Sequence, residues 1–324
     1  MSTNVTEGAL VRLSAEAKLT VPSAVTARTA RTGRKQRIEA YSLLVLLGII
    51  WGMAFVALKV METYLSPVNM TLLRWLIACA AFIALAPVAG RLKTRFNIRD
   101  LPRFLIVAFT LVVCYNLALN FSEKIISAGL AGLLVALGPV FLIILSYVFT
   151  GEERRREVVL AMVLAFSGAL ILSFGAEGGG SDSIIGVMEA VGSALSFAVY
   201  ALLSKPLVTK YGARPLTIWT GIAGTAMLLP LLSSSFFSHV QAMPPAGWMA
   251  ILYLSLLSSV VGYMLFYMLL DRGLISRLSI QLYLVPVVSV IGGTVLLSEP
   301  VTVYTIGGGG MLLSAIALTS RKRK

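Results

Sequence analysis

Charged residues are scarce in this chain of 324 residues. Only 13% of them are Asp, Glu, Lys or Arg, whereas soluble domains average about 25%. Hydrophobic residues make up 58% of the chain, and the mean hydropathy is +0.90. This composition excludes an ordinary soluble globular protein and predicts a protein that crosses a membrane several times.

Cysteine and histidine are scarcer still, and each scarcity excludes a class of site. The two cysteines, Cys79 and Cys114, lie in apolar runs, so no disulfide framework is expected. His239 is the one histidine and is expected in an outside loop, away from the spans, so we expect neither a histidine-dependent triad nor a multi-histidine metal site. The G-x-S-x-G nucleophile elbow and the G-x-x-x-x-G-K-[ST] phosphate loop do not occur. We therefore expect no enzymatic activity, no metal and no cofactor.

Acidic residues are few relative to basic ones, 14 against 27, which gives a net charge of +13. A basic protein can bind nucleic acid, but single-stranded nucleic acid is held by basic residues interleaved with aromatic ones, and the sequence has no such patch. The basic residues are instead distributed between apolar runs. We expect the partner to be a lipid bilayer and not a nucleic acid.

Long apolar runs dominate the rest of the chain. A membrane-spanning helix needs about 20 mostly apolar residues. Ten runs meet this requirement, at residues 41–60, 68–89, 104–121, 127–149, 157–175, 184–204, 215–234, 247–269, 278–297 and 301–319.

The basic residues predict how these runs are oriented. Apart from Lys59, Arg74 and Lys124, every Lys and Arg lies in the N-terminal tail, in alternate loops or at the C-terminus. Loops rich in Lys and Arg stay in the cytoplasm. We therefore expect a multi-pass protein of the cell membrane with both termini in the cytoplasm.

The sequence divides into a tail and two similar units. Residues 1–38 have the composition of a disordered basic tail, and residues 321–324 form a basic C-terminus. YNLALNFSEKIISAGL at 115–130 resembles YMLFYMLLDRGLISRL at 263–278. The predicted repeats are residues 39–176 and 177–320, with five spans each. Because five is odd, the two repeats must cross the membrane in opposite directions, which predicts an all-α integral membrane fold of ten transmembrane helices in two inverted five-helix repeats.

Over roughly 41–320, the sequence resembles an EamA-type carrier of the drug/metabolite transporter superfamily. The residues that carry this resemblance are Trp51-Gly52, Arg74, Ser127-Ala128-Gly129, Pro139, Gly151-Glu152, Pro286 and Glu299. The resemblance implies a carrier of small organic solutes, often an exporter. It does not imply a particular solute.

Polar and aromatic residues inside the spans are the candidates for binding substrate, because lipid cannot satisfy a polar group. An alternative for each is a hydrogen bond between helices. Two prolines inside spans, Pro139 and Pro286, are expected to kink their helices around a shared cavity. The substrate-binding candidates are Trp51, Arg74, Tyr115, Asn116, Asn120, Ser196, Tyr200, Tyr263, Gln281 and Tyr283.

Four charged residues in or next to spans invite separate interpretations. Arg74 could bind a substrate carboxylate, pair with Glu189 or extend to the membrane surface. If transport is coupled to protons, Glu189 is the expected coupling residue, and otherwise it is a pairing partner. Glu152 and Glu299 are expected to cap the helices that follow them.

Together these features predict a secondary transporter that moves a small organic metabolite, such as an amino acid, by alternating access. Export is the favoured direction. Efflux of drugs or of nucleotide-type solutes is an alternative within the same class. A polytopic membrane enzyme is the alternative from another class. The sequence leaves open whether the carrier forms a homodimer.

Overall fold

The computed structural model describes residues 34–85, 87, 95–138, 140–142, 144, 145, 156–174, 181–271 and 279–320, and all regular secondary structure within them is helical. The first half contains α3 (Arg34–Met61), α4 (Pro67–Leu85), η1 (Ile98–Asp100), α5 (Leu101–Ala108), η2 (Phe109–Tyr115), α6 (Asn116–Ile125), α7 (Ala128–Val135) and α9 (Arg156–Phe174). The second half contains α10 (Ser181–Tyr211), α11 (Ala213–Leu228), η3 (Leu229–Leu231), α12 (Phe236–Gln241), α13 (Pro245–Leu252), η4 (Tyr253–Val261), α14 (Gly262–Asp271), α15 (Ser279–Leu297) and α16 (Val303–Ser320).

Several of these helices have the length and composition of membrane spans. Five are long and apolar enough to cross a membrane, at Tyr41–Met61, Pro67–Leu85, Ile98–Ile125, Ile184–Tyr211 and Pro245–Phe266. Shorter apolar helices lie at Ala128–Leu142, Val159–Phe174, Tyr283–Leu297 and Val303–Leu318. The described residues therefore form an all-helical, multi-pass membrane protein, and the count of ten spans stays a prediction.

Short polar residues mark where helices begin. The Ser127 side chain accepts a hydrogen bond from the Leu130 N–H at the start of α7, at 3.3 Å. The Thr302 hydroxyl accepts one from the Thr305 N–H at the start of α16, at 3.2 Å. Such contacts satisfy N–H groups that have no partner inside the helix, and this is why Ser and Thr favour these positions.

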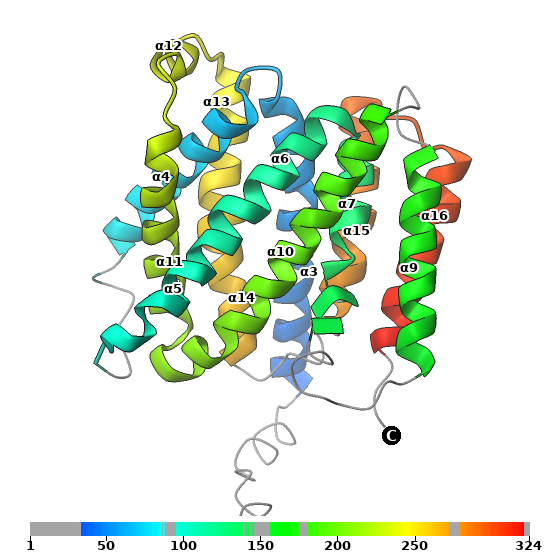
Figure 1. Ribbon diagram of the computed structural model, residues 1–324, viewed down its shortest axis with the longest axis horizontal. Helices are drawn as coiled ribbons and strands as arrows, with labels where there is room; N and C mark the ends of the chain where they lie inside the picture. Colours follow the sequence, from blue (N-terminus) through cyan, green and yellow to red (C-terminus); the bar gives the residue numbers. More distant parts are fainter. Residues whose placement is uncertain are drawn as a thin grey trace, which may run out of the picture.

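The helices stand side by side and define two ends of the bundle (Figure 1). The helix α3 begins and α16 ends at one end, here named the tail end, and the short α12 lies at the opposite end, here named the α12 end. Neighbours far apart in sequence pack along each other: α9 with α16, α3 with α15, α10 with α6, and α11 with α4. These contacts join the two halves of the chain into one bundle.

At the edge of the bundle, α9 packs closely along α16 (Figure 1). A Cβ atom added to Gly168 would lie 2.8 Å from the Gly308 carbonyl oxygen, and one added to Gly308 would lie 2.7 Å from that of Gly168. Small residues let helix backbones approach closely in membranes, where dispersion and not the hydrophobic effect drives packing. This pair of glycines therefore fixes the position of α16 against α9.

Two π-helical turns interrupt the long helices in the middle of the bundle. One is η2, between α5 and α6, and the other is η4, between α13 and α14. At each, a polar side chain donates to the carbonyl five residues earlier: Asn116, directly after η2, to Leu111, at 2.7 Å, and Ser259, within η4, to Leu254, at 2.9 Å. Single π turns of this kind are rare and often occur at functional sites.

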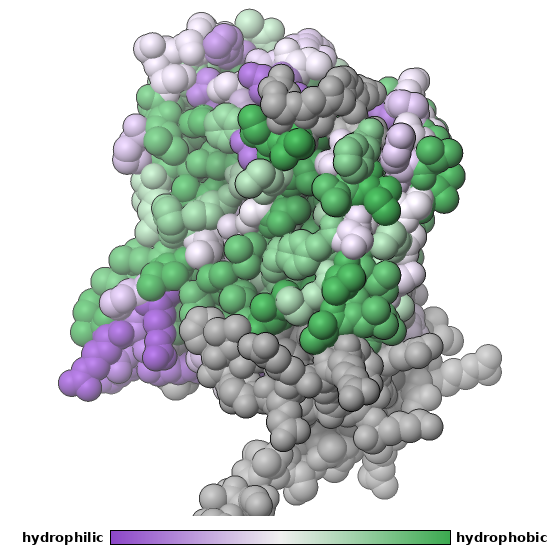
Figure 2. Space-filling view, turned by 45° about the vertical axis from the view of Figure 1, so that its right-hand side comes forward, coloured by the Kyte–Doolittle hydropathy of each residue, from purple (hydrophilic) through white to green (hydrophobic). Residues whose placement is uncertain are grey.

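The surface has an apolar middle and polar ends (Figure 2). Large apolar side chains stand exposed along the middle of the outer helices, among them Val163 at 57% and Leu170 at 61% on α9, and Ile291 at 56% on α15. Exposure of so many apolar side chains to water would be unfavourable, whereas exposure to the hydrocarbon of lipid is not. The exposed belt therefore faces the hydrocarbon of a bilayer.

Candidate binding cavity

A cavity opens in the middle of the bundle, between helices of both halves. Its empty volume, counted together with space open to solvent, is about 750 Å³. Most of its lining is apolar or aromatic. The lining residues are Trp51, Ala54, Phe55, Leu58, Arg74, Tyr115, Leu119, Val135, Ala136, Gly138, Phe197, Ser258, Tyr263, Val285 and Pro286.

Arg74 is the charged residue in this lining. It lies on α4, and its side chain is buried, with 4% of the residue exposed. Its Nε donates a hydrogen bond to the Ser259 hydroxyl at 2.9 Å, and its Nη2 donates to the Ser258 hydroxyl at 3.4 Å. Within the described part of the chain no carboxylate lies within ion-pair distance of the guanidinium. Because a guanidinium has five N–H donors, most of its donors stay available.

The π-helical turn η4 explains how Arg74 is held. Ser259 donates its own hydroxyl hydrogen to the Leu254 carbonyl, which the π turn leaves at the right spacing. The lone pairs of the same hydroxyl then face Arg74. The serine pair therefore orients the guanidinium without neutralising its charge.

Aromatic rings surround the space next to Arg74. The Trp51 ring lies 5.5 Å from that of Tyr263 and 6.5 Å, edge on, from that of Phe197. Tyr115 closes the set, with its ring 5.6 Å from Phe197. The indole N–H of Trp51 donates to the Ser258 carbonyl at 3.1 Å, so this ring is fixed to η4. The cavity thus combines rigid aromatic walls with one buried cation.

The cavity brings together some of the predicted residues and not others. Arg74, Trp51, Tyr115 and Tyr263 line it, and Pro286, inside α15, forms part of its wall. Asn116, Asn120, Ser196, Tyr200 and Tyr283 do not belong to the lining. Pro139, Glu152 and the side chain of Gln281 lie outside the described residues.

The predicted polar residues outside the lining have local roles. Asn120 donates to the Thr71 hydroxyl at 2.7 Å and so joins α6 to α4, which is the helix–helix bond that was the alternative expectation. Asn116 satisfies the π turn η2. Ser196 donates to the Gly192 carbonyl within α10, at 2.9 Å, and the Tyr200 ring packs 5.7 Å from Phe197.

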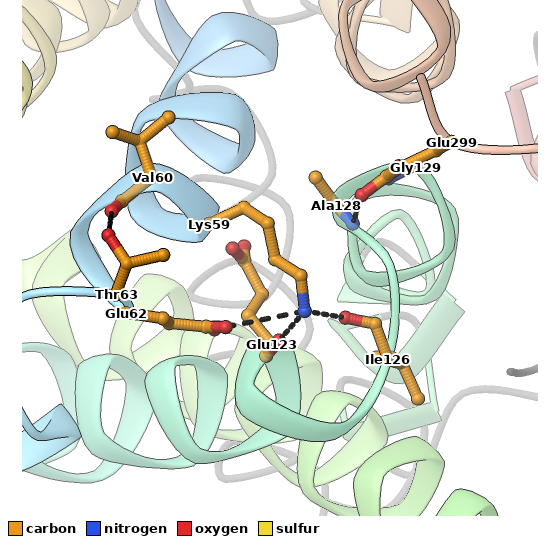
Figure 3. Close-up of polar contacts among 9 residues, drawn as sticks. All are labelled: Lys59, Val60, Glu62, Thr63, Glu123, Ile126, Ala128, Gly129 and Glu299. Atoms are coloured by element: carbon orange, nitrogen blue, oxygen red, sulfur yellow. Dashed lines mark hydrogen bonds and ion pairs between the residues drawn. The ribbon is translucent and has the colours of Figure 1, made fainter. Parts of the chain in front are cut away.

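One alternative for Arg74 is excluded, and one expectation about a glutamate needs correction. Glu189 lies partly buried on α10, and no ion pair joins it to Arg74, whose guanidinium donates to the two serines. Glu299 does act at a helix N-terminus, but at that of α7 and not of α16. Its two carboxylate oxygens accept from the N–H groups of Ala128, at 2.7 Å, and Gly129, at 3.0 Å (Figure 3).

Residues that sequence reasoning missed complete the site. Phe197 adjoins a predicted residue in sequence, and Ser258 and Ser259 stand as a hydroxyl pair in an apolar run, which is a usable signal. Glu123 is completely buried, although the predicted third span ended at residue 121. Its spacing of three and seven residues from Asn120 and Asn116 puts all three on one helical face, and this pattern could have revealed it.

Glu123 belongs to a polar cluster at the α12 end, formed by Lys59, Glu62 and Glu123 and named here the outer charge cluster (Figure 3). The Lys59 ammonium donates to the backbone carbonyls of Glu123 and of Ile126, the latter at 3.0 Å. It also pairs with the Glu62 carboxylate at 3.3 Å. Neither carboxylate oxygen of Glu123 has a hydrogen-bond partner among the described residues.

Comparisons with known proteins agree with this architecture. The sequence model of the EamA-like transporter family matches residues 38–174 and again residues 184–321. An uncharacterized transporter of Archaeoglobus fulgidus is 32% identical over 88% of this chain and its own full length. A probable terminal-alkyne amino-acid exporter of Streptantibioticus cattleyicolor is 30% identical over 88% of this chain and 94% of its own. A solved crystal structure with 17% identity covers 86% of this chain and 96% of its own, with a TM-score of 0.58, which shows a shared fold.

Proposed function

The chain belongs to the EamA-like transporter family, and on that premise we propose that it exports a small organic metabolite with a carboxylate, such as an amino acid. The metabolite binds in the central cavity with its carboxylate on Arg74. The protein is a transporter and not an enzyme, as the family and the named relatives indicate.

The observation that carries this proposal is the buried Arg74 guanidinium in a mostly apolar cavity. A buried cation that lacks a counter-charge is unfavourable by several kcal/mol. Two serine hydroxyls reduce this cost only in part, because a hydroxyl bears no net charge. A carboxylate entering the cavity would supply the counter-charge and could bind the planar guanidinium through two parallel hydrogen bonds.

The aromatic walls suggest what the rest of the substrate is. Trp51, Tyr115, Phe197 and Tyr263 present apolar ring surface beside the cation. An amino acid with an apolar or aromatic side chain would bury that side chain against the rings while its carboxylate meets Arg74. The relative named as an amino-acid exporter supports the same class of substrate.

Transport by alternating access needs two halves that can move against each other. The family model matches each half once, and the π turns η2 and η4 lie at corresponding places in the two halves. Both observations support a duplicated chain whose ten spans form two inverted repeats, residues 39–176 and 177–320. The basic side chains of Arg95, Arg99 and Arg103 at the tail end support a cytoplasmic position for that end.

Two experiments test this proposal. Purified protein in liposomes should show saturable counterflow of amino acids. Changing Arg74→Lys keeps the charge but loses the bidentate geometry, so apparent affinity should fall about tenfold, the equivalent of one charge-assisted hydrogen bond. The matched control is Arg99→Lys, since Arg99 is exposed at the tail end. Equal affinity in wild type and Arg74→Lys, with normal insertion, would reject a substrate role for Arg74.

The topology has its own test. Cysteines introduced beside Glu152 and beside Glu299 should react with an impermeant thiol reagent from opposite sides of the membrane. Reaction of both from one side would contradict the inverted repeats.

A further inference from the structure

The outer charge cluster is a second set of ionisable groups, on the same helices as residues that line the cavity. Leu58 and Leu119 line the cavity, and Lys59 and Glu123 follow them on α3 and α6. Burial of the side chains increases toward the bundle interior: Lys59 is 29% exposed, Glu62 is 10% exposed, and Glu123 is completely buried. Substrate binding at Arg74 does not use these groups.

The contacts of Lys59 hold the α12 end of the bundle together. Its ammonium, on the last turn of α3, donates to the backbone carbonyls of Glu123, in α6, and of Ile126, between α6 and α7. Glu299 lies in the loop after α15, and its carboxylate accepts hydrogen bonds from the first N–H groups of α7. Figure 3 shows these contacts next to each other, with elements of both halves converging. The Lys59 contacts lie within the first half, whereas the Glu299 contacts beside them join the second half to the first, so movement of one half against the other must break or rearrange the Glu299 contacts next to the cluster.

The charges of the cluster do not balance when both carboxyl groups are ionised. One ammonium then faces two carboxylates, and Glu123 has no hydrogen-bond donor at all among the described residues. Each carboxylate also has one further cation and one further anion nearby, Lys124 and Glu299 for Glu62, and Arg74 and Glu299 for Glu123, so these neighbours do not supply the missing positive charge. A buried carboxylate without a donor or a full counter-charge is strongly unfavourable.

One proton removes this imbalance. We propose that Glu62 and Glu123 together bind one proton when the α12 end is closed, so that closing this end takes up a proton from the adjacent water. One O–H bond forms, between a carboxylate oxygen and a proton from the adjacent water, and no other covalent bond of the protein changes. The Lys59 ammonium then balances the one carboxylate that remains. The inference rests on the proposed function only in assuming that this end opens and closes.

Glu62, which follows the span Tyr41–Met61, gives independent support. Burial raises its pKa from 4.5 to about 7, although the neighbouring Lys59 acts in the opposite direction. When the cluster opens to water, the carboxyl returns toward its ordinary pKa. A group whose pKa is raised in the closed state stabilises that state below its ordinary pKa, and this stabilisation is lost as the pH rises through the raised value. Acid therefore favours the closed α12 end, and pH above about 7 favours the open one.

The test measures opening of this end without any substrate. Leu119→Cys, in the full chain with Cys79→Ala and Cys114→Ala, places a thiol in the cavity, where the native residue is 2% exposed. Its rate of reaction with an impermeant thiol reagent added at the α12 side is divided by the rate for Phe237→Cys, since Phe237 is 64% exposed on α12. Both thiols react as thiolates, so the ratio corrects for most of the pH dependence of the thiol chemistry. From pH 5.5 to 8.5 the ratio should rise about thirtyfold, if the carboxyl pKa moves between 4.5 and about 7.

Variants show whether the cluster is responsible. Glu62→Gln or Glu123→Gln leaves one carboxyl group beside the Lys59 ammonium, so there are no longer two carboxylates for one ammonium. The ratio should then stay at the low value that the wild type has in acid. Glu189→Gln, which removes a carboxyl on α10, is the matched control and should keep the wild-type pH dependence. If Glu123→Gln does not fold, Glu62→Gln alone tests the proposal, because Glu62 lies at the rim of the cluster.

A ratio that does not change with pH in the wild type would overturn the proposal. So would an unchanged pH dependence in folded Glu62→Gln. Either result would leave substrate binding at Arg74 untouched, because no substrate is present in the assay. Conversely, loss of the Arg74 effect on counterflow would overturn the proposed function while the pH-dependent labelling could persist.

Discussion

The contact between Glu299 and the start of α7 should be a major source of stability. The carboxylate accepts two backbone hydrogen bonds, at 2.7 and 3.0 Å, from a helix that belongs to the other half of the chain. Charge-assisted hydrogen bonds contribute about 1.5–3 kcal/mol each, less where solvent reaches them, and Glu299 is partly exposed. We expect Glu299→Ala to lower the free energy of unfolding by ~2–4 kcal/mol and Glu299→Gln, which keeps one acceptor, by ~1–2 kcal/mol.

Gly293 offers a way to break the same contact without changing the charge. A Cβ atom at this position would lie 2.2 Å from a carboxylate oxygen of Glu299 and 3.0 Å from its carboxyl carbon, so the side chain must move. Gly293→Ala should therefore cost at least ~1 kcal/mol, by loss of a hydrogen bond. Gly307→Ala is the matched control, because nothing lies within 4 Å of its Cβ position. It should be neutral or stabilising by up to ~1 kcal/mol.

Unfolding in mixed micelles, followed by near-UV circular dichroism, measures these differences. The reasoning is refuted if Glu299→Ala lowers the free energy of unfolding by less than ~0.5 kcal/mol, which is below the value of one net hydrogen bond. It is also refuted if Gly293→Ala and Gly307→Ala have the same effect.

Three smaller predictions concern single residues. Ser298 has a φ of 58°, a left-handed conformation that is unfavourable for a residue with a Cβ, so Ser298→Gly should raise the free energy of unfolding by ~1 kcal/mol in the same assay. Asn120→Ala removes the bond to Thr71 and should lower it by ~0.6–1.7 kcal/mol. Ser259→Ala frees the Arg74 guanidinium from its orienting partner, so counterflow should show a weaker apparent affinity while the protein stays folded.

Much of the helical architecture could be predicted from the sequence, because apolar runs of a given length have few alternatives in a membrane. The long spans Tyr41–Met61 and Pro67–Leu85 begin within a residue of the predicted runs. The buried charge of Arg74 and the position of Pro286 in the cavity wall also follow from residue type and place in a span. Such features could be predicted because they depend on the residue type and on the neighbouring sequence.

Features that depend on distant neighbours could not be predicted. Glu299 precedes α16 in sequence, but the fold places its carboxylate at the start of α7, where it accepts hydrogen bonds from two backbone N–H groups. Asn116 looked like a cavity residue, yet the π turn η2 frees a carbonyl that its amide satisfies. Glu123 lies near the end of a span, where water is expected, and only the convergence of α3, α6 and α7 buries it.

The most direct measurement compares an amino acid with its amide in wild type and in Arg74→Gln. Affinities come from titration calorimetry on the purified, folded proteins. If the carboxylate binds Arg74, the amide should bind wild type at least tenfold more weakly than the acid, since one charge-assisted hydrogen bond contributes ~1.5–3 kcal/mol. In Arg74→Gln the acid and the amide should bind within about twofold of each other, because the glutamine carries no charge. The same preference for the acid in both proteins would contradict the assignment of Arg74 as the carboxylate-binding residue.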